Sequence, residues 1–222
     1  MNWLVSSIQS DNRLLEPMER ITEVLFALIM ALTFTCSFSV ASAGREEVRA
    51  MLVGVLGCNI AWGIIDAFFH LMNSFSDFGQ RILKLKAVRG ANTPLVAHRV
   101  IADALPPVVA SILSPSDLEA MRLKLKGLPA PPTRPRLRPK DLWGALATFL
   151  VVVLSTLPVV APFTVISDTR RALRTSNSIA ILMLFVAGYA FGRLSGHRPL
   201  TMGVAMVVLG GAMVAITIAL GG

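Results

Sequence analysis

Apolar residues are gathered into five long stretches, separated by short polar segments and by one long polar segment. Because an α-helix rises about 1.5 Å per residue and the hydrocarbon core of a bilayer is about 30 Å thick, roughly 20 apolar residues cross it. The stretches near this length are residues 21–43, 50–72, 142–165, 177–191 with its flanks, and 200–220. The pattern predicts an all-α, polytopic membrane protein with about five transmembrane helices.

The polar segments predict how the chain is organised around these helices. A charged turn is expected at 44–49, and the second helix should continue past the membrane to Lys86, whose stem can reach the headgroups. Pro94 suits the first turn of a short helix, and Ser114 suits the cap of another. The expected parts are an amphipathic lead-in at 1–20 in place of a cleavable signal peptide, a transmembrane hairpin at 21–73, a basic loop with short helices at 74–140, and helices 3 to 5 at 141–222.

Charge sets the expected orientation. The chain is 54% hydrophobic, yet its net charge is +8, and twelve of its 21 lysines and arginines lie in residues 74–140. Basic loops of this kind usually stay in the cytoplasm. We therefore expect a cytoplasmic amino terminus and an external carboxyl terminus, in the inner (plasma) membrane of the cell. The basic loop is explained by membrane lipid headgroups, and no nucleic acid partner is expected.

A polar stripe on the second helix carries the first candidate chemistry. Asn59, Gly63, Asp66, His70 and Asn73 recur at helical spacing along an otherwise apolar rod. A charge in hydrocarbon costs about 2.5–3.5 kcal/mol on insertion scales, so an embedded acid indicates a function. Asp66 and His70 offer oxygen and nitrogen ligands for Fe²⁺, Mn²⁺ or Zn²⁺, or a proton relay. A structural salt bridge at Asp66 and a solvated interfacial His70 remain alternatives.

The first helix offers a facing set of residues. Glu23, Met30 and Ser37 recur at intervals of seven and share one face. Because the first two helices should run antiparallel, Glu23 and Asp66 both lie in the inner half of the membrane, where they could close one site. Glu23 is also three residues from Arg20, and the alternative is an ordinary capping acid at the interface.

Prolines and small residues mark where the later helices should contact protein. Pro158 and Pro162 each remove an amide donor, and lipid cannot satisfy the freed carbonyls, so this part of the third helix should face protein or a wet cavity. Small residues that allow close helix packing are Gly188, Gly192, Gly210 and Gly211. Cys36 and Cys58 are interpreted as packing residues, with metal ligation as the alternative.

These motifs resemble the vacuolar iron transporter family. Residues 145–150 followed by the two-proline segment 157–163 are similar to the family's third helix, and residues 184–188 with 193–196 to its fourth helix and exit. Gly203 with Gly210 is similar to its fifth. The resemblance implies a five-helix exporter of Fe²⁺ or Mn²⁺, with Asp66 at the position of a metal-binding glutamate. The family's first-helix aspartate and acidic loop have no counterpart here.

The expected function is therefore export of a divalent metal, iron or manganese, with proton coupling as an option. The protein is expected to be a homodimer, not an enzyme, and to bind no permanent cofactor. Asp66 and Glu23 are the expected ligands, and Pro158 with Pro162 the flexing element. The auxiliary metal residues are Met30, His70 and Asn59. The alternative is a non-transporting membrane protein whose basic loop binds anionic lipid or a protein partner. An intramembrane hydrolase is disfavoured because no serine or cysteine pairs with a histidine at a credible depth.

Overall fold

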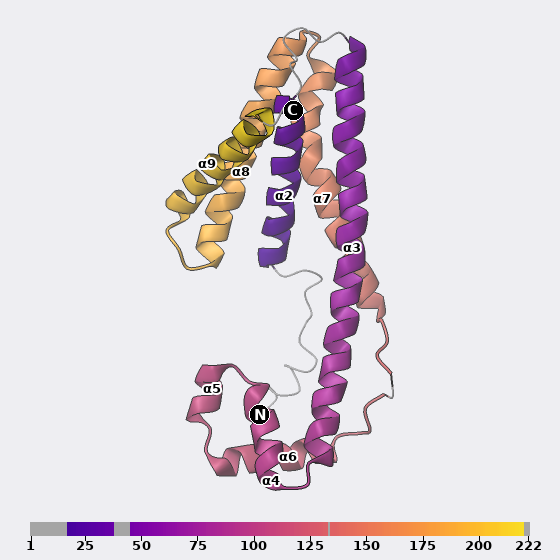
Figure 1. Cartoon of the computed structure of the whole chain (residues 1–222), viewed down its shortest axis with the longest axis vertical. Coiled ribbons are helices and arrows are strands. Elements are labelled where there is room, and N and C mark those ends of the chain that lie inside the picture. The colour runs from indigo at the N-terminus through magenta and orange to yellow at the C-terminus, as the bar shows by residue number, and fades with distance from the viewer. Residues whose placement is uncertain (1–16, 38–44, 133, 220–222) are drawn as a thin grey trace. The chain divides into compact units, whose positions relative to one another are not determined.

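The computed structural model describes residues 17–37, 45–132 and 134–219, and every regular element in these ranges is a helix (Figure 1). The prediction of an all-α, polytopic membrane protein is confirmed. Most of the expected lead-in, residues 1–16, lies outside the described residues. The helices are α2 (Pro17–Ser37), α3 (Arg45–Gly90), α4 (Pro94–Asp103), α5 (Pro107–Ile112), α6 (Pro115–Gly127), α7 (Pro139–Val165), α8 (Thr169–Leu194) and α9 (Pro199–Ala219).

Four of the described helices, α3, α7, α8 and α9, are long and apolar enough to cross a membrane. In α2, three charged residues, Glu19, Arg20 and Glu23, lie in the first two turns, ahead of an apolar run. A membrane-spanning role for α2 therefore stays a prediction.

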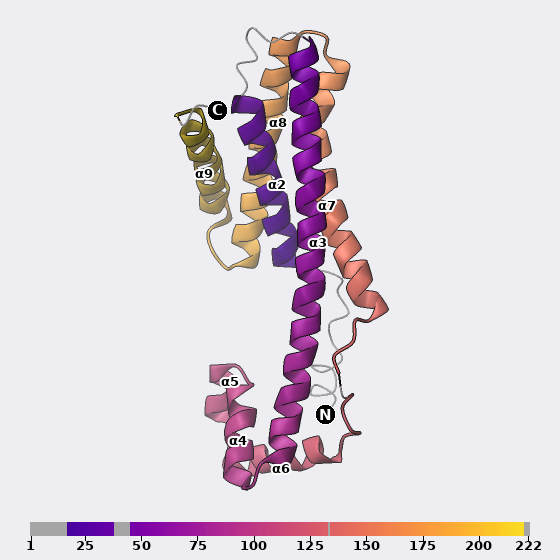
Figure 2. The same cartoon turned by 45° about the vertical axis from the view of Figure 1, so that its right-hand side comes forward.

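Two compact units divide the chain, and α3 contributes to both. The first unit holds residues 1–70 and 140–222, with α2, the start of α3, α7, α8 and α9. Its core draws on several helices, with Leu28, Val55, Val159 and Leu184 fully buried. In this unit α3 and α7 run side by side in opposite directions, and α2 packs against α8 and α9 (Figure 2).

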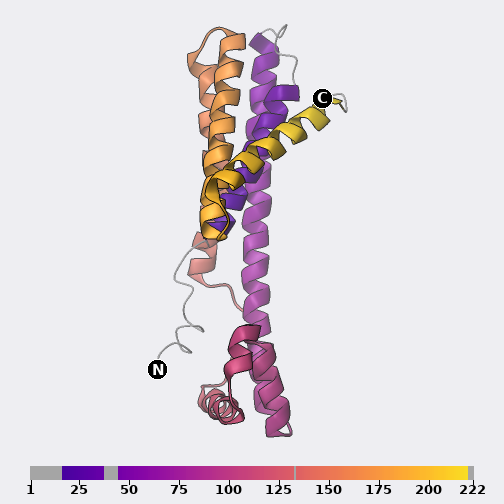
Figure 3. The ribbon, with the colours of Figure 1, turned by 90° about the vertical axis from the view of Figure 1, so that its left-hand side faces the viewer.

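Glycines bring α8 and α9 into close contact, and α9 crosses α8 obliquely (Figure 3). A Cβ atom at Gly188 would lie 2.7 Å from Met206 Cγ, and one at Gly210 would lie 2.8 Å from Leu184 Cδ1. The packing role predicted for these glycines is confirmed. For Gly211 it is wrong within the described part of the chain, where a Cβ would meet no atom within 4 Å.

The proline segment of α7 faces protein on one side only. Pro162 is buried, as expected for a segment that faces protein, whereas Pro158 is exposed in the single chain, where a wet cavity beside it stays a prediction. Next to the prolines, the Ser176 hydroxyl of α8 donates a hydrogen bond to the Val159 carbonyl at 2.6 Å. This bond ties α8 to α7 beside the prolines, whereas the carbonyls that lose their helical donors are those of Leu154 and Pro158, four residues before each proline.

The second unit, residues 71–139, folds around the far end of α3. Helices begin where the sequence predicts them, at Pro94 and Pro115, because Thr93 and Ser114 accept hydrogen bonds from the first-turn amides, and Ser114 with Asp117 forms a capping box. The guanidinium of Arg89 donates to the carbonyls of Leu125, Leu128 and Pro129. These are the last carbonyls of α6 and those just beyond it, so a cation caps the negative end of that helix.

Two local expectations differ from the structure. Residues 45–49 are the first turns of α3 and not a turn between helices, and Glu46 and Glu47 there lie at the positive end of the helix dipole. Helix α5 was not predicted from the sequence. It is a six-residue helix that begins at Pro107, a residue whose fixed φ suits a first helical turn.

Candidate functional site

Two acids from neighbouring helices meet inside the first unit. Glu23 of α2 and Asp66 of α3 are close enough for a hydrogen bond between their side chains and for charge repulsion. One oxygen of each carboxyl group, Glu23 Oε2 and Asp66 Oδ2, is buried and has no hydrogen-bond partner among the described residues. The two helices thus place a pair of carboxyl groups at one point, with spare acceptor oxygens.

Such a pair needs a positive partner. Two like charges a hydrogen bond apart cannot both persist in a medium of low dielectric constant unless a proton or a cation stands between them. Carboxylate oxygens are ligands suited to hard and borderline divalent ions, among them Mn²⁺ and Fe²⁺. In chemical terms, a pair of this kind is suited to one shared proton or to one metal ion.

His70 is not gathered with this pair into a three-residue metal site, and the sequence spacing places Met30 further along its own helix. His70 lies one turn further along α3, and Met30 lies two turns from Glu23 on α2. Within the described ranges no group of three histidine, cysteine or acidic side chains is close enough to hold a metal ion. The acid pair by itself thus supplies two acidic ligands, without a third histidine, cysteine or acidic side chain from the described residues.

Asn59 lies apart from the acids, two turns before Asp66 on the same face of α3. Its side chain is only 1% exposed. The Nδ2 group donates to the Val55 carbonyl at 3.0 Å, while Oδ1 is buried with no hydrogen-bond partner in the described part of the chain. A buried amide oxygen without a donor costs roughly 1–3 kcal/mol, and it is a neutral ligand for a cation or a water molecule.

Hydroxyl groups on α7 were missed by sequence reasoning. Thr148, Ser155 and Thr156 are buried, and each donates to a carbonyl of its own helix. The signal was their spacing of seven and eight residues, which places them along one side of an apolar helix. A hydroxyl that donates keeps its acceptor lone pairs, so these residues add oxygen acceptors inside the bundle.

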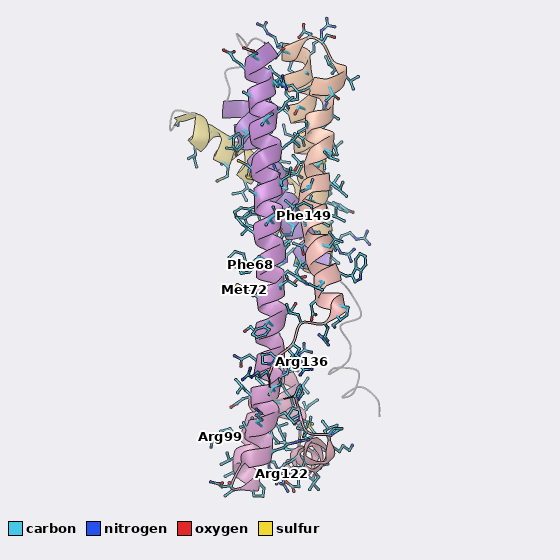
Figure 4. The ribbon with its side chains drawn as sticks, turned by 90° about the vertical axis from the view of Figure 1, so that its right-hand side faces the viewer. Phe68, Met72, Arg99, Arg122, Arg136 and Phe149 are labelled. Atoms are coloured by element: carbon cyan, nitrogen blue, oxygen red, sulfur yellow. The ribbon has the colours of Figure 1, made fainter. Side chains whose placement is uncertain are left out.

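Between Asn59 and Asp66, α3 is in direct contact with α7. A Cβ atom at Gly63 would lie 3.1 Å from the Phe149 ring, 3.4 Å from the Phe149 carbonyl and 3.5 Å from Val152 Cβ. Figure 4 shows Phe149 at the boundary between these two helices. An aromatic ring therefore covers the polar stripe of α3 between its amide and its carboxylate.

A cavity lies at the end of the bundle where α3 begins. It measures about 320 Å³ and is lined by the first turns of α3, including Arg49 and Leu52, and by residues 163–167, 169 and 172 around the α7–α8 connection. Leu52 is two turns before Asn59 on α3. Along this helix the order is thus cavity, Asn59, Phe149 contact, acid pair.

The comparisons with known proteins give one result. A model of the VIT family matches residues 95–222, more than half of the chain. No curated protein matches it. The family match covers α7, α8 and α9 and most of the second unit. It begins after α2 and α3, the helices that hold the acid pair.

Proposed function

Because the chain belongs to the VIT family, a family of membrane transporters, we propose that it moves Fe²⁺ or Mn²⁺ across the membrane with Glu23 and Asp66 as its charged ligands. The observation that carries the proposal is the meeting of these two carboxyl groups inside a membrane bundle, with one buried oxygen on each that has no partner in the described parts of the chain. A divalent ion cancels both charges at once, which a single amine or guanidinium does not.

The same pair supports coupling to protons. When the metal leaves, the two carboxylates repel each other until a proton enters between them. Metal moving one way is then exchanged for protons moving the other way. The proposed direction is export from the cytoplasm of the cell, across its plasma membrane, with the amino terminus inside. Asn59, His70 and Met30 complete the coordination at different points of the path, and Pro158 with Pro162 lets α7 flex.

A homodimer is the proposed working form. Long apolar side chains remain exposed along α3 and α9 in the single chain, among them Ile64 (58%), Phe68 (59%) and Val208 (64%). Lipid covers such a face as well as protein does, so the exposed area alone does not select the partner. What a second copy would complete is the two-ligand site.

The competing function is a non-transporting membrane protein whose basic loop binds anionic lipid or a protein. The observation in its favour is that two of the loop acids are held by partners within the second unit. Glu119 binds Arg122 and His98, and Asp117 binds Ser114, so neither carboxylate is free to collect metal.

The deciding experiment is metal uptake by proteoliposomes that contain the full-length protein. Asp66→Asn and Glu23→Gln keep the shape of each side chain and remove its charge. Both variants should lower the initial rate of Mn²⁺ and Fe²⁺ uptake by more than about 10-fold. Mutating a residue that only hydrogen-bonds to a metal ligand typically lowers metal affinity or activity by at least about that factor, and a direct ligand should matter more. Asp77→Asn is the matched control, since Asp77 is an exposed acid on the same helix, and its uptake should equal that of the wild type.

Equal uptake by the wild type and Asp66→Asn would remove the proposed site. The competing function predicts a different pattern, in which reversing the charge of Arg134 and Arg136 abolishes the cellular phenotype and Asp66→Asn leaves it unchanged. Size-exclusion profiles of every variant in detergent control for folding.

A further inference from the structure

We propose that Phe149 is the gate of the transport path and that its ring, seated on Gly63, separates the acid pair from a second ion position at Asn59. The gate rests on the proposed function for its purpose, although its geometry stands without it. It adds a gating residue and an order of steps to a site that otherwise consists of ligands alone.

The proposed gate consists of Gly63 on α3, which has no side chain, and the ring of Phe149 on α7, which packs against it. Gly63 lies on the polar face of α3, four residues after Asn59 and three before Asp66. The ring of Phe149 comes within 3.1 Å of where its Cβ would stand, and Val152, which is fully buried, within 3.5 Å. Any larger residue at 63 would hold α7 away from α3, so the glycine is what lets the ring close onto the backbone.

Polar groups lie on both sides of this contact. On one side are Asp66 and Glu23, and on the other is Asn59, with a buried oxygen to which no described residue donates a hydrogen bond. Because α3 and α7 are antiparallel, Thr156, two turns after Phe149, lies on the Asn59 side. It is fully buried and donates to the Val152 carbonyl, so its hydroxyl oxygen keeps the capacity to accept or coordinate.

An ion cannot cross the aromatic contact while it is closed. To pass the ring, the ion must lose the water molecules on that side, and a phenyl group offers no oxygen ligand to replace them. The free energy of desolvation is then similar to that of a charge in hydrocarbon. The neutral Asn59 oxygen binds a divalent ion more weakly than two carboxylates do. An ion that passes the opened ring is therefore held loosely at Asn59, two turns of α3 from Leu52 in the wall of the cavity, and weak binding there favours release.

Thiol accessibility tests the gate without any need for transport. In a chain with Cys36 and Cys58 replaced by alanine, Asn59→Cys is placed in proteoliposomes, and a small, membrane-impermeant thiol reagent is added to one side at a time. With Phe149 present, we expect modification only from the side on which α3 begins. With Phe149→Ala, modification should also occur from the Asp66 side, at least 10 times faster than before.

A matched aromatic control and a second variant keep the test decisive. Phe26→Ala removes a ring of the same bundle that is 54% exposed and contacts Trp62, and it should leave the sidedness unchanged. Phe149→Leu keeps most of the volume and should give an intermediate rate, which covers the case in which Phe149→Ala does not fold.

The outcomes separate the gate from the transporter. Modification rates at position 59 that do not depend on residue 149, or a thiol that reacts from neither side in any variant, would overturn the gate even if Asp66 is required for uptake. The expected labelling pattern in a protein that takes up no Mn²⁺ or Fe²⁺ would support the gate and refute the proposed substrates.

Discussion

The contact between α8 and α9 predicts that one added methyl group at Gly188 destabilises the bundle. A Cβ there would lie 2.7 Å from Met206 Cγ, 2.8 Å from the Met202 carbonyl oxygen and 2.9 Å from Met206 Cβ. The Met206 side chain can turn aside, but the Met202 carbonyl belongs to the backbone of α9 and moves only with the helix. Restoring ordinary contact distances requires α9 to shift by roughly half an ångström, and overpacking of this kind typically costs about 1–3 kcal/mol.

Gly211→Ala isolates this packing effect from helix propensity. Both substitutions replace a helical glycine by alanine, which by itself favours the helix by up to about 1 kcal/mol. Gly211 has no neighbouring atom within 4 Å of the new Cβ, so only Gly188→Ala should meet a clash. The free energy of unfolding should therefore be lower for Gly188→Ala than for Gly211→Ala by about 1–3 kcal/mol.

The assay is reversible unfolding of the purified protein in mixed micelles as the fraction of dodecyl sulfate rises, followed by far-ultraviolet circular dichroism. Equal unfolding free energies for the two variants would refute the reasoning, because they would mean that α9 does not lie against Gly188. A Gly188→Ala variant more stable than the wild type would refute it more strongly.

Two further predictions concern single polar contacts. Hydrogen bonds from Arg122, followed by His98, lower the pKa of Glu119 from its usual 4.5 to about 2, so the stabilisation from the ionised Glu119 is present above pH 4.5 and is lost as the pH falls towards 2. Pepsin cleavage within residues 91–128 should accelerate over this range in the wild type and depend less on pH in Glu119→Gln. Identical pH profiles for the two proteins would contradict the assignment. Ser176→Ala should lower the unfolding free energy by about 0.5–1.7 kcal/mol, since it removes the donor to the Val159 carbonyl inside the bundle. The control is Ser178→Ala, which should have little effect in the same micelle assay, because Ser178 is exposed and donates to the Arg174 carbonyl of its own helix.

Local signals in the sequence were sufficient for the helices and their ends. Membrane-length apolar stretches predicted the long helices. The cap at Ser114 and the first-turn proline Pro94 predicted where two loop helices begin, because both signals act within a few residues of chain. The segment 45–49 was misread because its charges indicate solvent exposure, and a helix that emerges from a membrane is also exposed. Helix α5 is too short for a periodic pattern to be detected.

The sequence by itself determined that this protein lies in a membrane, and that Asp66 and Glu23 are the acids with the strongest reason to be there, since the cost of a charge in hydrocarbon applies to each residue separately. Only the tertiary structure decided that these acids meet, that His70 is not gathered with them, and that Phe149 lies over Gly63. Helical periodicity fixes which residues share a face of one helix, but it does not fix which face turns toward which neighbour. That choice depends on the fit of glycines against rings and backbone across helix pairs, a property of two segments that neither segment carries alone.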